Sequence, residues 1–214
     1  SRIGMSNIIR IEPTSPAFTI TWNIGLYCNF DCMYCPAYWH SKTGPIKSLN
    51  ELKSNWLEIL DKTQHTKLKY KISFTGGEVT ANKDFLLFVE WLDAEYSDII
   101  SEMGFTTNGS ASLKYYQQAI NVKSISYISF STHSEFFNER KFFTTITDIS
   151  ETARQLNKSV HVNIMDEYWN KDRTQLYVDY CVLHNINHSV NVVHYEEKVR
   201  DEPITNLNSQ KFEF

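Results

Sequence analysis

Three cysteines are the residues of this sequence best suited to metal chemistry. Cys28, Cys32 and Cys35 form a C-x₃-C-x₂-C pattern, and the fourth cysteine, Cys181, stands alone. Thiolates bind soft metals and iron–sulfur clusters. Because a [4Fe–4S] cluster usually takes four cysteines, three thiolates can ligate three irons and leave the fourth iron open for another ligand. The pattern therefore predicts a metal centre with one open position.

Three other interpretations of the cysteines remain open from the pattern alone. A structural zinc site could use them with His40 as the fourth ligand, although zinc modules more often separate two ligand pairs by a dozen or more residues. A ferredoxin-type run would be spaced C-x₂-C-x₂-C, which the first interval here violates. The last interpretation is a chance grouping of inert, buried cysteines. A disulfide framework is disfavoured, because it would spread an even number of cysteines across a short secreted chain.

The elements that position these residues alternate from about residue 18 onward. Strands are predicted at 18–24, 70–74, 99–106, 125–131, 159–165 and 189–194. Helices are predicted at 48–62, around 85–92 with Asn82 or Asp84 as the cap, and at 112–120, 144–156 and 173–187. This alternation indicates parallel βαβ units. Since a complete eight-fold barrel needs about 250 residues, we expect an α/β fold, a partial (β/α)₆ TIM-like barrel open on one side. An open doubly wound sheet is the alternative.

Several predicted strands alternate polar and apolar side chains. The polar faces carry Thr19, Thr21 and Asn23, then Ser129, Ser131 and His133, then His161, Asn163 and Met165. A closed barrel interior is normally filled with branched apolar side chains. A polar inner face instead predicts a cavity that holds a polar molecule. A half-solvated antiparallel sheet would show the same alternation, but the intervening helices disfavour it.

These motifs together resemble the radical S-adenosylmethionine (radical SAM) superfamily. Tyr34 is an aromatic residue just before the last cysteine of the loop, as in that family. Gly76-Gly77-Glu78, 41 residues beyond Cys35 and at the end of the second predicted strand, is similar to the family's G-G-E motif. Thr107-Asn108-Gly109 closes the third strand, and the polar residues Ser129, Ser131 and His133 end the fourth. The rhythm of strands and helices over about 18–195 is similar to the family's (β/α)₆ core.

The resemblance implies an enzyme with two cofactors, a [4Fe–4S] cluster and S-adenosylmethionine (SAM). Cys28, Cys32 and Cys35 would ligate three irons, and the amino and carboxylate groups of SAM would chelate the fourth. Electron transfer from the reduced cluster would cleave SAM to methionine and a 5′-deoxyadenosyl radical, which abstracts hydrogen from a substrate. That substrate is unidentified, either a peptide or protein or a small metabolite. The electron would come from a flavodoxin- or ferredoxin-like donor.

The resemblance also implies which residues contact SAM. Glu78 would bind the SAM ammonium through a charge-assisted hydrogen bond, and Gly76 and Gly77 would let the backbone approach the ligand closely. Tyr34 would pack beside the adenine, chiefly through its backbone, and Asn108 would reach the methionyl end. The remaining expected contacts are Ser129 or Ser131 to the ribose or carboxylate, Asn163 to the ribose, and the backbone near Val193 and His194 to the adenine.

Other residues extend or limit this hypothesis. His133, at a strand end, is a candidate acid, base or substrate contact, and no other catalytic residue is predicted. Val79 follows Glu78 where many relatives have proline. No further cysteine group follows the core, so auxiliary clusters are not expected, and Cys181 is expected to be a buried core residue. The alternative function is a binding or sensor module, stabilised by zinc or a cluster, without catalysis.

Composition limits the partners and the location of the protein. The 214 residues include 21 basic and 25 acidic side chains, for a net charge of −4, which argues against a nucleic-acid partner. No apolar run approaches ~18 residues, so no membrane span is expected. The first five residues lack the apolar stretch of a secretory signal, and crowded thiols suit a reducing compartment, so we expect a cytoplasmic protein. The expected organisation is an N-terminal extension (1–17), a core (18–195) and a C-terminal tail (196–214).

Overall fold

A single parallel sheet organises the molecule. The computed structural model describes residues 16–36 and 38–193, in which six strands pair in the order of the chain. They are β1 (Ala17–Asn23), β2 (Lys69–Thr75), β3 (Ile100–Thr107), β4 (Ile125–Ser131), β5 (Ser159–Asp166) and β6 (Asn187–Val192). Every neighbouring pair is parallel. A doubly wound sheet would reverse its strand order at a switch point, whereas this order confirms the predicted partial (β/α)₆ barrel.

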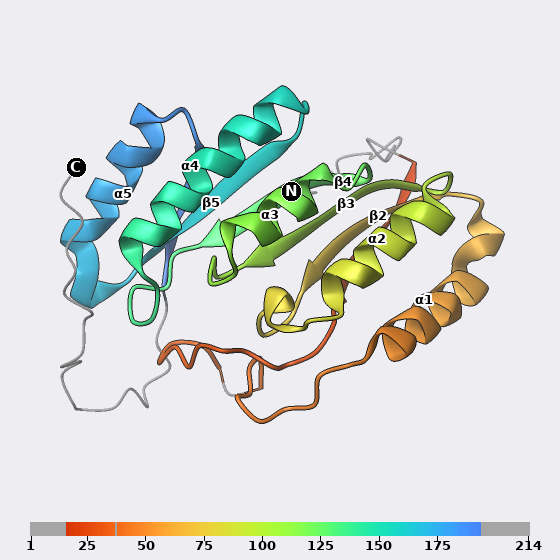
Figure 1. Ribbon diagram of the computed structural model, residues 1–214. Helices are drawn as coiled ribbons and strands as arrows, with labels where there is room; N and C mark the ends of the chain where they lie inside the picture. The colour runs from red at the N-terminus through yellow and green to blue at the C-terminus, as the bar shows by residue number, and fades with distance from the viewer. Residues whose placement is uncertain (1–15, 37, 194–214) are drawn as a thin grey trace, which may run out of the picture.

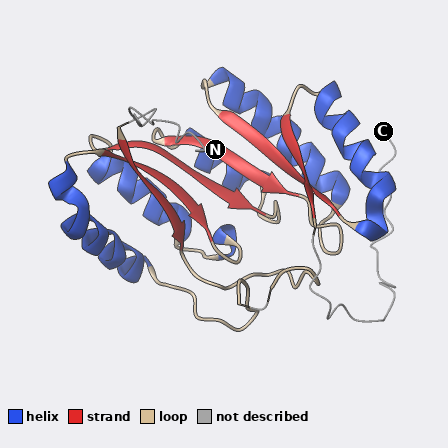
Figure 2. Ribbon diagram, turned by 180° about the vertical axis from the view of Figure 1, so that it is seen from behind, coloured by secondary structure: helices blue, strands red, loops and turns tan. Residues whose placement is uncertain are grey.

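Helices cover one face of this sheet, and the opposite face carries none in the described part of the chain (Figures 1 and 2). The α-helices are α1 (Leu49–Thr63), α2 (Phe85–Tyr96), α3 (Leu113–Asn121), α4 (Glu139–Gln155) and α5 (Lys171–Leu183). Short 3₁₀ helices are η1 (Gln64–Thr66), η2 (Val79–Ala81) and η3 (Tyr168–Asn170). The loop that carries the three cysteines runs beneath the carboxyl ends of the strands (Figure 1).

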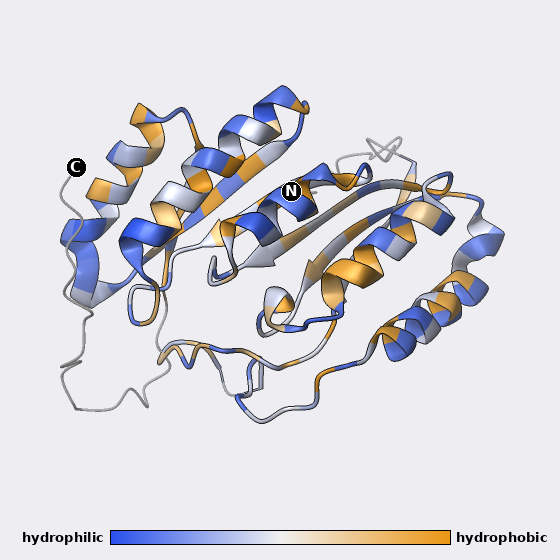
Figure 3. Cartoon of the chain, in the orientation of Figure 1, coloured by the Kyte–Doolittle hydropathy of each residue, from blue (hydrophilic) through white to orange (hydrophobic). Residues whose placement is uncertain are grey.

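The hydrophobic core lies between the sheet and the helices. The helices carry both hydrophilic and hydrophobic stretches, as expected of helices with one face on a sheet (Figure 3). Near α1, the fully buried Trp56 packs edge-on against Tyr70, with ring centroids 5.2 Å apart, and stacks on Trp22 at 6.4 Å. Such aromatic pairs add about 0.5–1.5 kcal/mol each beyond the burial of their area. The aromatic residues therefore hold β1 and β2 firmly under α1.

Helix ends differ from the sequence-based expectation where local polar contacts decide them. Helix α4 begins at Glu139 rather than near Thr144, because the Asn138 side chain accepts the Lys141 N–H at 2.9 Å and caps the helix. Helix α5 ends at Leu183 rather than near residue 187. Asn185 has a φ of 52°, in the left-handed region that stops a helix. Strand β6 consequently begins at Asn187, two residues before its predicted start.

The predicted capping residues of α1 and α2 agree with the structure only in part. The Ser48 and Glu51 capping box at the start of α1 is present, with Ser48 N–H donating to the Glu51 carboxylate at 2.8 Å. Asp84 precedes α2, but its side chain makes no capping bond to that helix. It accepts the N–H of Leu49 at 3.0 Å instead, which ties the start of α1 to α2. Of the two predicted caps, Asp84 was wrong, because a tertiary contact uses its carboxylate. Asn82 Oδ1 accepts the Asp84 N–H at 2.9 Å, directly before the helix.

The inner face of the sheet is polar, as the alternation predicted. The Asn163 amide donates to Ser129 Oγ at 2.8 Å, and His161 Nε2 lies 3.0 Å from Ser189 Oγ. On the opposite face, residues such as Phe130 and Val162 are fully buried. The predicted extension and tail are largely residues 1–15 and 194–214, which lie outside the described residues, and the core starts with β1 at Ala17. The predicted domain boundaries stay predictions.

Candidate active site

A cavity of about 330 Å³ opens at the carboxyl ends of the strands. In a parallel barrel this end gathers the loops that follow the strands. The predicted site residues that line the cavity are Cys28, Cys32, Tyr34, Cys35, Gly76, Gly77, Glu78, Asn108, Ser131 and His133. Met165 of β5 and Val192 of β6 close the far side. The fold therefore joins the cysteine loop to residues from the ends of the other five strands.

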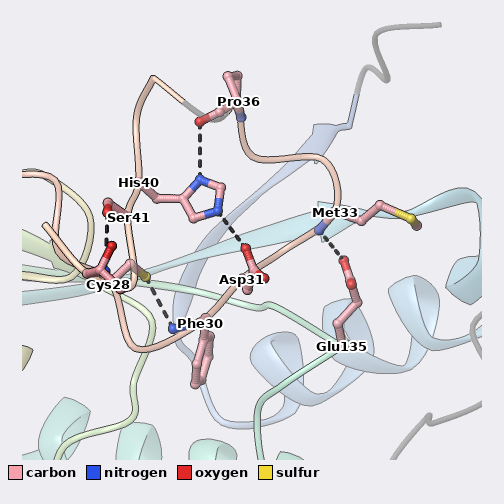
Figure 4. A network of polar contacts seen from close by, with 9 residues as sticks. Cys28, Phe30, Asp31, Met33, Pro36, His40, Ser41 and Glu135 are labelled. Atoms are coloured by element: carbon pink, nitrogen blue, oxygen red, sulfur yellow. Dashed lines mark hydrogen bonds and ion pairs between the residues drawn. The ribbon is translucent and has the colours of Figure 1, made fainter. Parts of the chain in front are cut away.

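Backbone hydrogen bonds shape the cysteine loop. Cys28 N–H donates to Ser41 O at 3.0 Å, which pairs the start of the loop with the segment that returns after it. Cys35 N–H donates to Cys32 O at 3.0 Å and closes a tight turn between these two cysteines. The Glu135 carboxylate, after β4, accepts Met33 N–H at 3.0 Å (Figure 4). The loop is thus held from both sides of the cavity.

Burial keeps the three thiols of the loop in their neutral form when no metal is bound. Burial raises the pKa of the Cys28 thiol to about 11. The pKa of Cys32 is raised further, by deeper burial and by the nearby carboxylate of Glu135, and burial also raises the pKa of Cys35. Because only the thiolate binds metal, loading this site must release thiol protons. Cys181, by contrast, is fully buried in α5 and does not line the cavity, as expected of a core cysteine.

The two glycines of the Gly-Gly-Glu turn are needed because another backbone crosses them. Gly77 N–H donates to Gly25 O at 2.9 Å, and Glu78 N–H donates to Tyr27 O at 2.8 Å. A Cβ at Gly77 would lie 2.3 Å from Tyr27 O, and one at Gly76 would lie 2.5 Å from Gly25 O. The close approach expected for a ligand is therefore also an approach to the chain leading into Cys28. The turn and the cysteine loop form one backbone unit.

Glu78 is buried and hydrogen-bonded by its own protein. One carboxylate oxygen accepts the Thr80 N–H at 3.0 Å, the Thr80 hydroxyl at 2.7 Å and the Thr107 hydroxyl at 2.8 Å. The other accepts the Asn108 N–H at 2.6 Å. Burial raises the pKa of Glu78, and these donors oppose that shift. Because a carboxylate oxygen accepts at least two hydrogen bonds, the second oxygen keeps capacity for a ligand.

Asn108 links the turn after β3 to the cysteine loop. Its side-chain NH₂ donates to Asn29 Oδ1 at 2.9 Å, and its side-chain oxygen Oδ1 accepts the Ser110 N–H at 3.0 Å. Gly109 follows with a φ of 75°, as expected for a turn. Asn108 lines the cavity, but its side chain is also part of the contact between loop and turn. Asn108 thus both stabilises the turn after β3 and forms part of the cavity wall.

Tyr34 and His133 form a stacked pair across the cavity wall. Their rings lie 5.9 Å apart at 19°, and the Tyr34 hydroxyl is hydrogen-bonded to His133 Nδ1. Burial lowers the pKa of His133 to about 4, so the imidazole is neutral near pH 7. Beside them, burial raises the pKa of Glu167 to about 7, and one Glu167 oxygen has no hydrogen-bond partner in the described residues. The Tyr34 ring therefore has a defined position, beyond the backbone role that was expected.

The predicted strand residues divide between the cavity and the sheet interior. Ser131 lines the cavity, whereas Ser129 and Asn163 do not and are hydrogen-bonded to each other instead. Asn163 also donates to Ser131 Oγ at 3.4 Å. Val193 lines the cavity, and His194 lies outside the described residues. The polar inner face as a whole does not form the cavity wall; only its carboxyl end does.

The arrangement of donors disfavours a zinc site. Within residues 16–36 and 38–193, no group of three His, Cys, Asp or Glu residues is placed to hold a single metal ion. Both ring nitrogens of His40 are engaged, Nδ1 with Pro36 O at 3.1 Å and Nε2 with Asp31 Oδ1 at 2.9 Å. Zinc needs ligands that converge on one point, whereas a cubane spreads three cysteines over three irons. The three sulfurs around one cavity fit the cluster.

The sequence did not predict several contacts of the site. Glu135 binds the cysteine loop from 102 residues away, and Thr107 binds Glu78 from 29 residues away. Asp31 and His40 hold each other inside the loop. Only the neighbourhood of the cysteines could have pointed to the last two. The other contacts depend on how loops from different strands meet.

Comparison with known proteins identifies the family. The sequence profile of the Radical SAM superfamily matches residues 22–166, which is more than half of the chain and includes the cysteine loop and the Gly-Gly-Glu turn. The chain belongs to the radical SAM superfamily. The predicted family is thereby confirmed. No curated protein matches the chain.

Solved structures of SuiB from Streptococcus suis share the radical SAM fold. The crystal structure of SuiB has a TM-score of 0.59 and 16% identity, with 86% of this chain and 42% of that chain covered. SuiB bound to S-adenosylmethionine has a TM-score of 0.55 and 16% identity (86% and 41% covered). SuiB bound to its precursor peptide SuiA has a TM-score of 0.55 and 17% identity (84% and 40% covered). This chain spans about two fifths of the length of these relatives.

One further observation concerns membranes. Within the described ranges of this radical SAM chain, no helix is both long and apolar enough to cross a bilayer. The longest, α4, has 17 residues and carries several charged side chains along its length.

Proposed function

We propose that this chain binds a [4Fe–4S] cluster through Cys28, Cys32 and Cys35 and cleaves SAM reductively. When bound, the cluster and SAM supply the chemistry of the family, in which electron transfer yields methionine and a 5′-deoxyadenosyl radical that abstracts hydrogen from a substrate. The single observation that carries the proposal is the convergence of the three cysteines and the Gly-Gly-Glu turn (76–78) on one cavity. A zinc site, a ferredoxin-type run or a chance grouping of the cysteines would not require the Gly-Gly-Glu turn to line the same cavity.

The residues of the chain would divide the work of binding. The three thiols would give up their protons and hold the cluster at one end of the cavity. Glu78, through the oxygen that accepts only the Asn108 N–H, would receive the ammonium of SAM. Ser131 is favoured over Ser129 as a polar contact, because only Ser131 lines the cavity. Asn163 would act through Ser131, to whose hydroxyl it donates, rather than by direct contact with the ribose.

His133 would serve on the wall opposite the Gly-Gly-Glu turn. Its imidazole is held by the Tyr34 hydroxyl at Nδ1 and by the Phe30 ring, which meets it edge-on at 6.2 Å. A neutral imidazole fixed in this way can donate or accept one hydrogen bond through Nε2. It would therefore orient a polar group of the substrate and exclude water from the cavity. The proposed role of His133 is therefore to contact the substrate. Proton transfer by His133 is not part of the proposal.

We propose a peptide or protein as the substrate. Trp39 lines the cavity and is 61% exposed, and its neighbour Tyr38 is 64% exposed. Exposed aromatic side chains favour contact with a polypeptide partner. The shared fold with SuiB, whose structure was solved with a precursor peptide, also supports this choice. A small metabolite is the alternative outcome of the substrate test.

A soluble electron donor and a reducing compartment complete the proposal. A flavodoxin- or ferredoxin-like protein would deliver the electron, since nothing in the described residues supplies a second redox centre. An iron–sulfur cluster with an open iron is sensitive to oxygen, and its thiolates must stay reduced. A cytoplasmic location meets both needs.

The test is anaerobic reconstitution with iron and sulfide, followed by SAM and a strong reductant. We expect about four irons per chain, and 5′-deoxyadenosine as a product. One tightly held zinc and no 5′-deoxyadenosine would overturn the proposal. A bound cluster without SAM cleavage would instead support a sensor.

A deuterium-transfer assay addresses the substrate. Deuterated peptides and deuterated metabolites are supplied separately, and deuterium is sought in 5′-deoxyadenosine. Transfer from a peptide supports the proposed substrate class, and transfer only from a metabolite overturns it.

A further inference from the structure

We propose that His40 is a positioning residue that sets the spacing of the cysteine loop, and so controls how firmly the loop holds its cluster. The inference rests on the proposed function, because it concerns the thiol ligands of that cluster. His40 lines the cavity and has a side chain only 11% exposed. The structure gives it a different role from the zinc ligand considered from the sequence. It binds the loop itself.

The return of the chain brings His40 to the middle of the loop. Tyr27 and Ser41 form a parallel bridge, in which Ser41 N–H donates to Leu26 O at 2.7 Å and Ser41 O accepts Cys28 N–H at 3.0 Å. His40 immediately precedes this bridge. Its backbone is therefore anchored beside the first cysteine, and its side chain lies between Pro36 and Asp31 (Figure 4). Anchoring at this point makes the imidazole a fixed element.

The imidazole joins both arms of the loop. Nδ1 lies 3.1 Å from Pro36 O, the carbonyl directly after Cys35. Nε2 lies 2.9 Å from Asp31 Oδ1, the carboxylate directly before Cys32. A carbonyl and a carboxylate both accept hydrogen bonds, so the ring donates to both only as the imidazolium, with a proton on each nitrogen. In that form one ring holds the residues on either side of the Cys32–Cys35 turn. A change in its position would move two ligands together.

Other contacts share the work of holding this turn. It closes on itself through Cys35 N–H and Cys32 O, and the Glu135 carboxylate accepts Met33 N–H from the side of β4. Trp39 N–H donates to Pro36 O at 2.9 Å and ties that carbonyl to the returning segment. The His40 ring adds a contact from the same segment to Asp31, the residue before Cys32, and so connects that cysteine to the bridge at Ser41.

The physical consequence is a pre-organised ligand set. A cubane accepts its thiolates at three corners of fixed separation, so a loop already at that spacing loses less conformational freedom on binding. Residues that orient metal ligands typically change metal affinity about 10–100-fold when they are replaced. We expect an effect in this range on the retention of the cluster, with little effect on the fold, because His40 packs on the loop and not in the core.

The test compares the reconstituted wild-type chain with three variants at this position. His40→Leu removes both contacts, His40→Gln keeps a donor placed like Nε2 for Asp31, and His40→Asn keeps a donor placed like Nδ1 for Pro36 O. His65→Leu is the matched control, since His65 is exposed and far along the chain in η1. Iron and sulfide content, the rate of cluster loss to an iron chelator, and the EPR spectrum of the reduced cluster are measured.

The expected result is cluster loss about tenfold faster or more in His40→Leu, with a changed EPR spectrum. The Gln and Asn variants should lie between Leu and wild type, and His65→Leu should equal wild type. The inference is overturned if His40→Leu matches wild type in both loss rate and spectrum. If His40→Leu does not fold, the Gln and Asn variants decide: wild-type behaviour of both overturns the inference. Failure of the wild type itself to bind a cluster would sink the proposed function instead.

Discussion

The backbone N–H of Glu78 donates a hydrogen bond of 2.8 Å to the carbonyl oxygen of Tyr27, the residue directly before Cys28. This contact joins the motif expected to bind SAM to the loop expected to bind iron. Gly77 makes the neighbouring contact, from its N–H to Gly25 O. The turn and the cysteine loop are therefore fixed relative to each other before any cofactor binds. A change in the backbone of the turn should displace the cysteine loop.

Gly77→Ala should separate these halves. The new Cβ would lie 2.3 Å from Tyr27 O, a distance that only a shift of the backbone can relieve. We expect a loss of about 1–3 kcal/mol in the free energy of unfolding, typical of overpacking, and a lower iron content. Gly44→Ala is the control, because its Cβ would meet only the Ser41 side chain, at 3.1 Å. Denaturant unfolding measures the stability of both variants, and iron analysis measures their iron content. Equal stability and equal iron content in the two variants would contradict the prediction.

Cys32→Ala should abolish cluster binding, because one corner of the cluster loses its thiolate. Cys181→Ala is the matched control. Cys181 is fully buried in α5 and does not line the cavity, so it is not placed to bind the cluster. We expect Cys181→Ala to cost about 1 kcal/mol of stability and to keep its cluster. Visible absorption after anaerobic reconstitution checks both. A cluster in the Cys32 variant would be incompatible with the assigned ligands.

Glu78→Gln should weaken both the fold and SAM binding. The carboxylate accepts four hydrogen bonds, from Thr80 N–H, the hydroxyls of Thr80 and Thr107, and Asn108 N–H. A glutamine NH₂ cannot accept any of them, so at least one buried donor loses its partner, at a cost of about 1–3 kcal/mol.

Thermal unfolding and calorimetric titration with SAM test the Glu78 prediction. Glu58→Gln is the control, since Glu58 lies on the surface of α1 with a side chain 64% exposed. Unchanged stability in Glu78→Gln would show that the carboxylate contacts are dispensable.

Glu167 should make stability depend on pH. Its carboxyl pKa is raised by burial from 4.5 to about 7. The folded chain therefore binds more protons than the unfolded chain between these values, and stability falls as pH rises from about 4.5 to 7. The total loss is up to about 3 kcal/mol. Glu167→Gln should lack this loss, so the variant should become more stable relative to wild type as pH rises through this range.

His133 should contribute a pH dependence of stability opposite to that of Glu167. Burial lowers its pKa to about 4, so the unfolded state binds the extra proton between about pH 4 and 6.5, and stability rises with pH there. His133→Phe keeps the ring on Tyr34 but removes this titration, so its slope should change in the direction opposite to that of Glu167→Gln. Denaturant unfolding at stepped pH measures both, and changes of slope in the same direction in the two variants, each relative to wild type, would refute the assignment.

Local patterns predicted most of the elements and the ligands. The spacing of Cys28, Cys32 and Cys35, the Gly-Gly-Glu triplet and the alternation of strands and helices are periodic or short-range features, and the structure has them where they were expected. Element ends were less predictable. The start of α4 depends on the Asn138 cap, and the end of α5 depends on the left-handed Asn185. Both are single-residue conformations that hydrophobic periodicity does not report.

What the sequence by itself determined is which residues are candidates for the chemistry and near which strand end each of them lies, because residue types and the order of the strands follow from the sequence. Only the tertiary structure decided which of them meet. It selected Ser131 over Ser129 for the cavity, placed the ring of His133 on Tyr34, and brought Glu135 to Met33. It also turned both nitrogens of His40 toward the loop. These outcomes depend on the register between strands and on the path of loops, which are set by packing over the whole sheet and not by any local pattern.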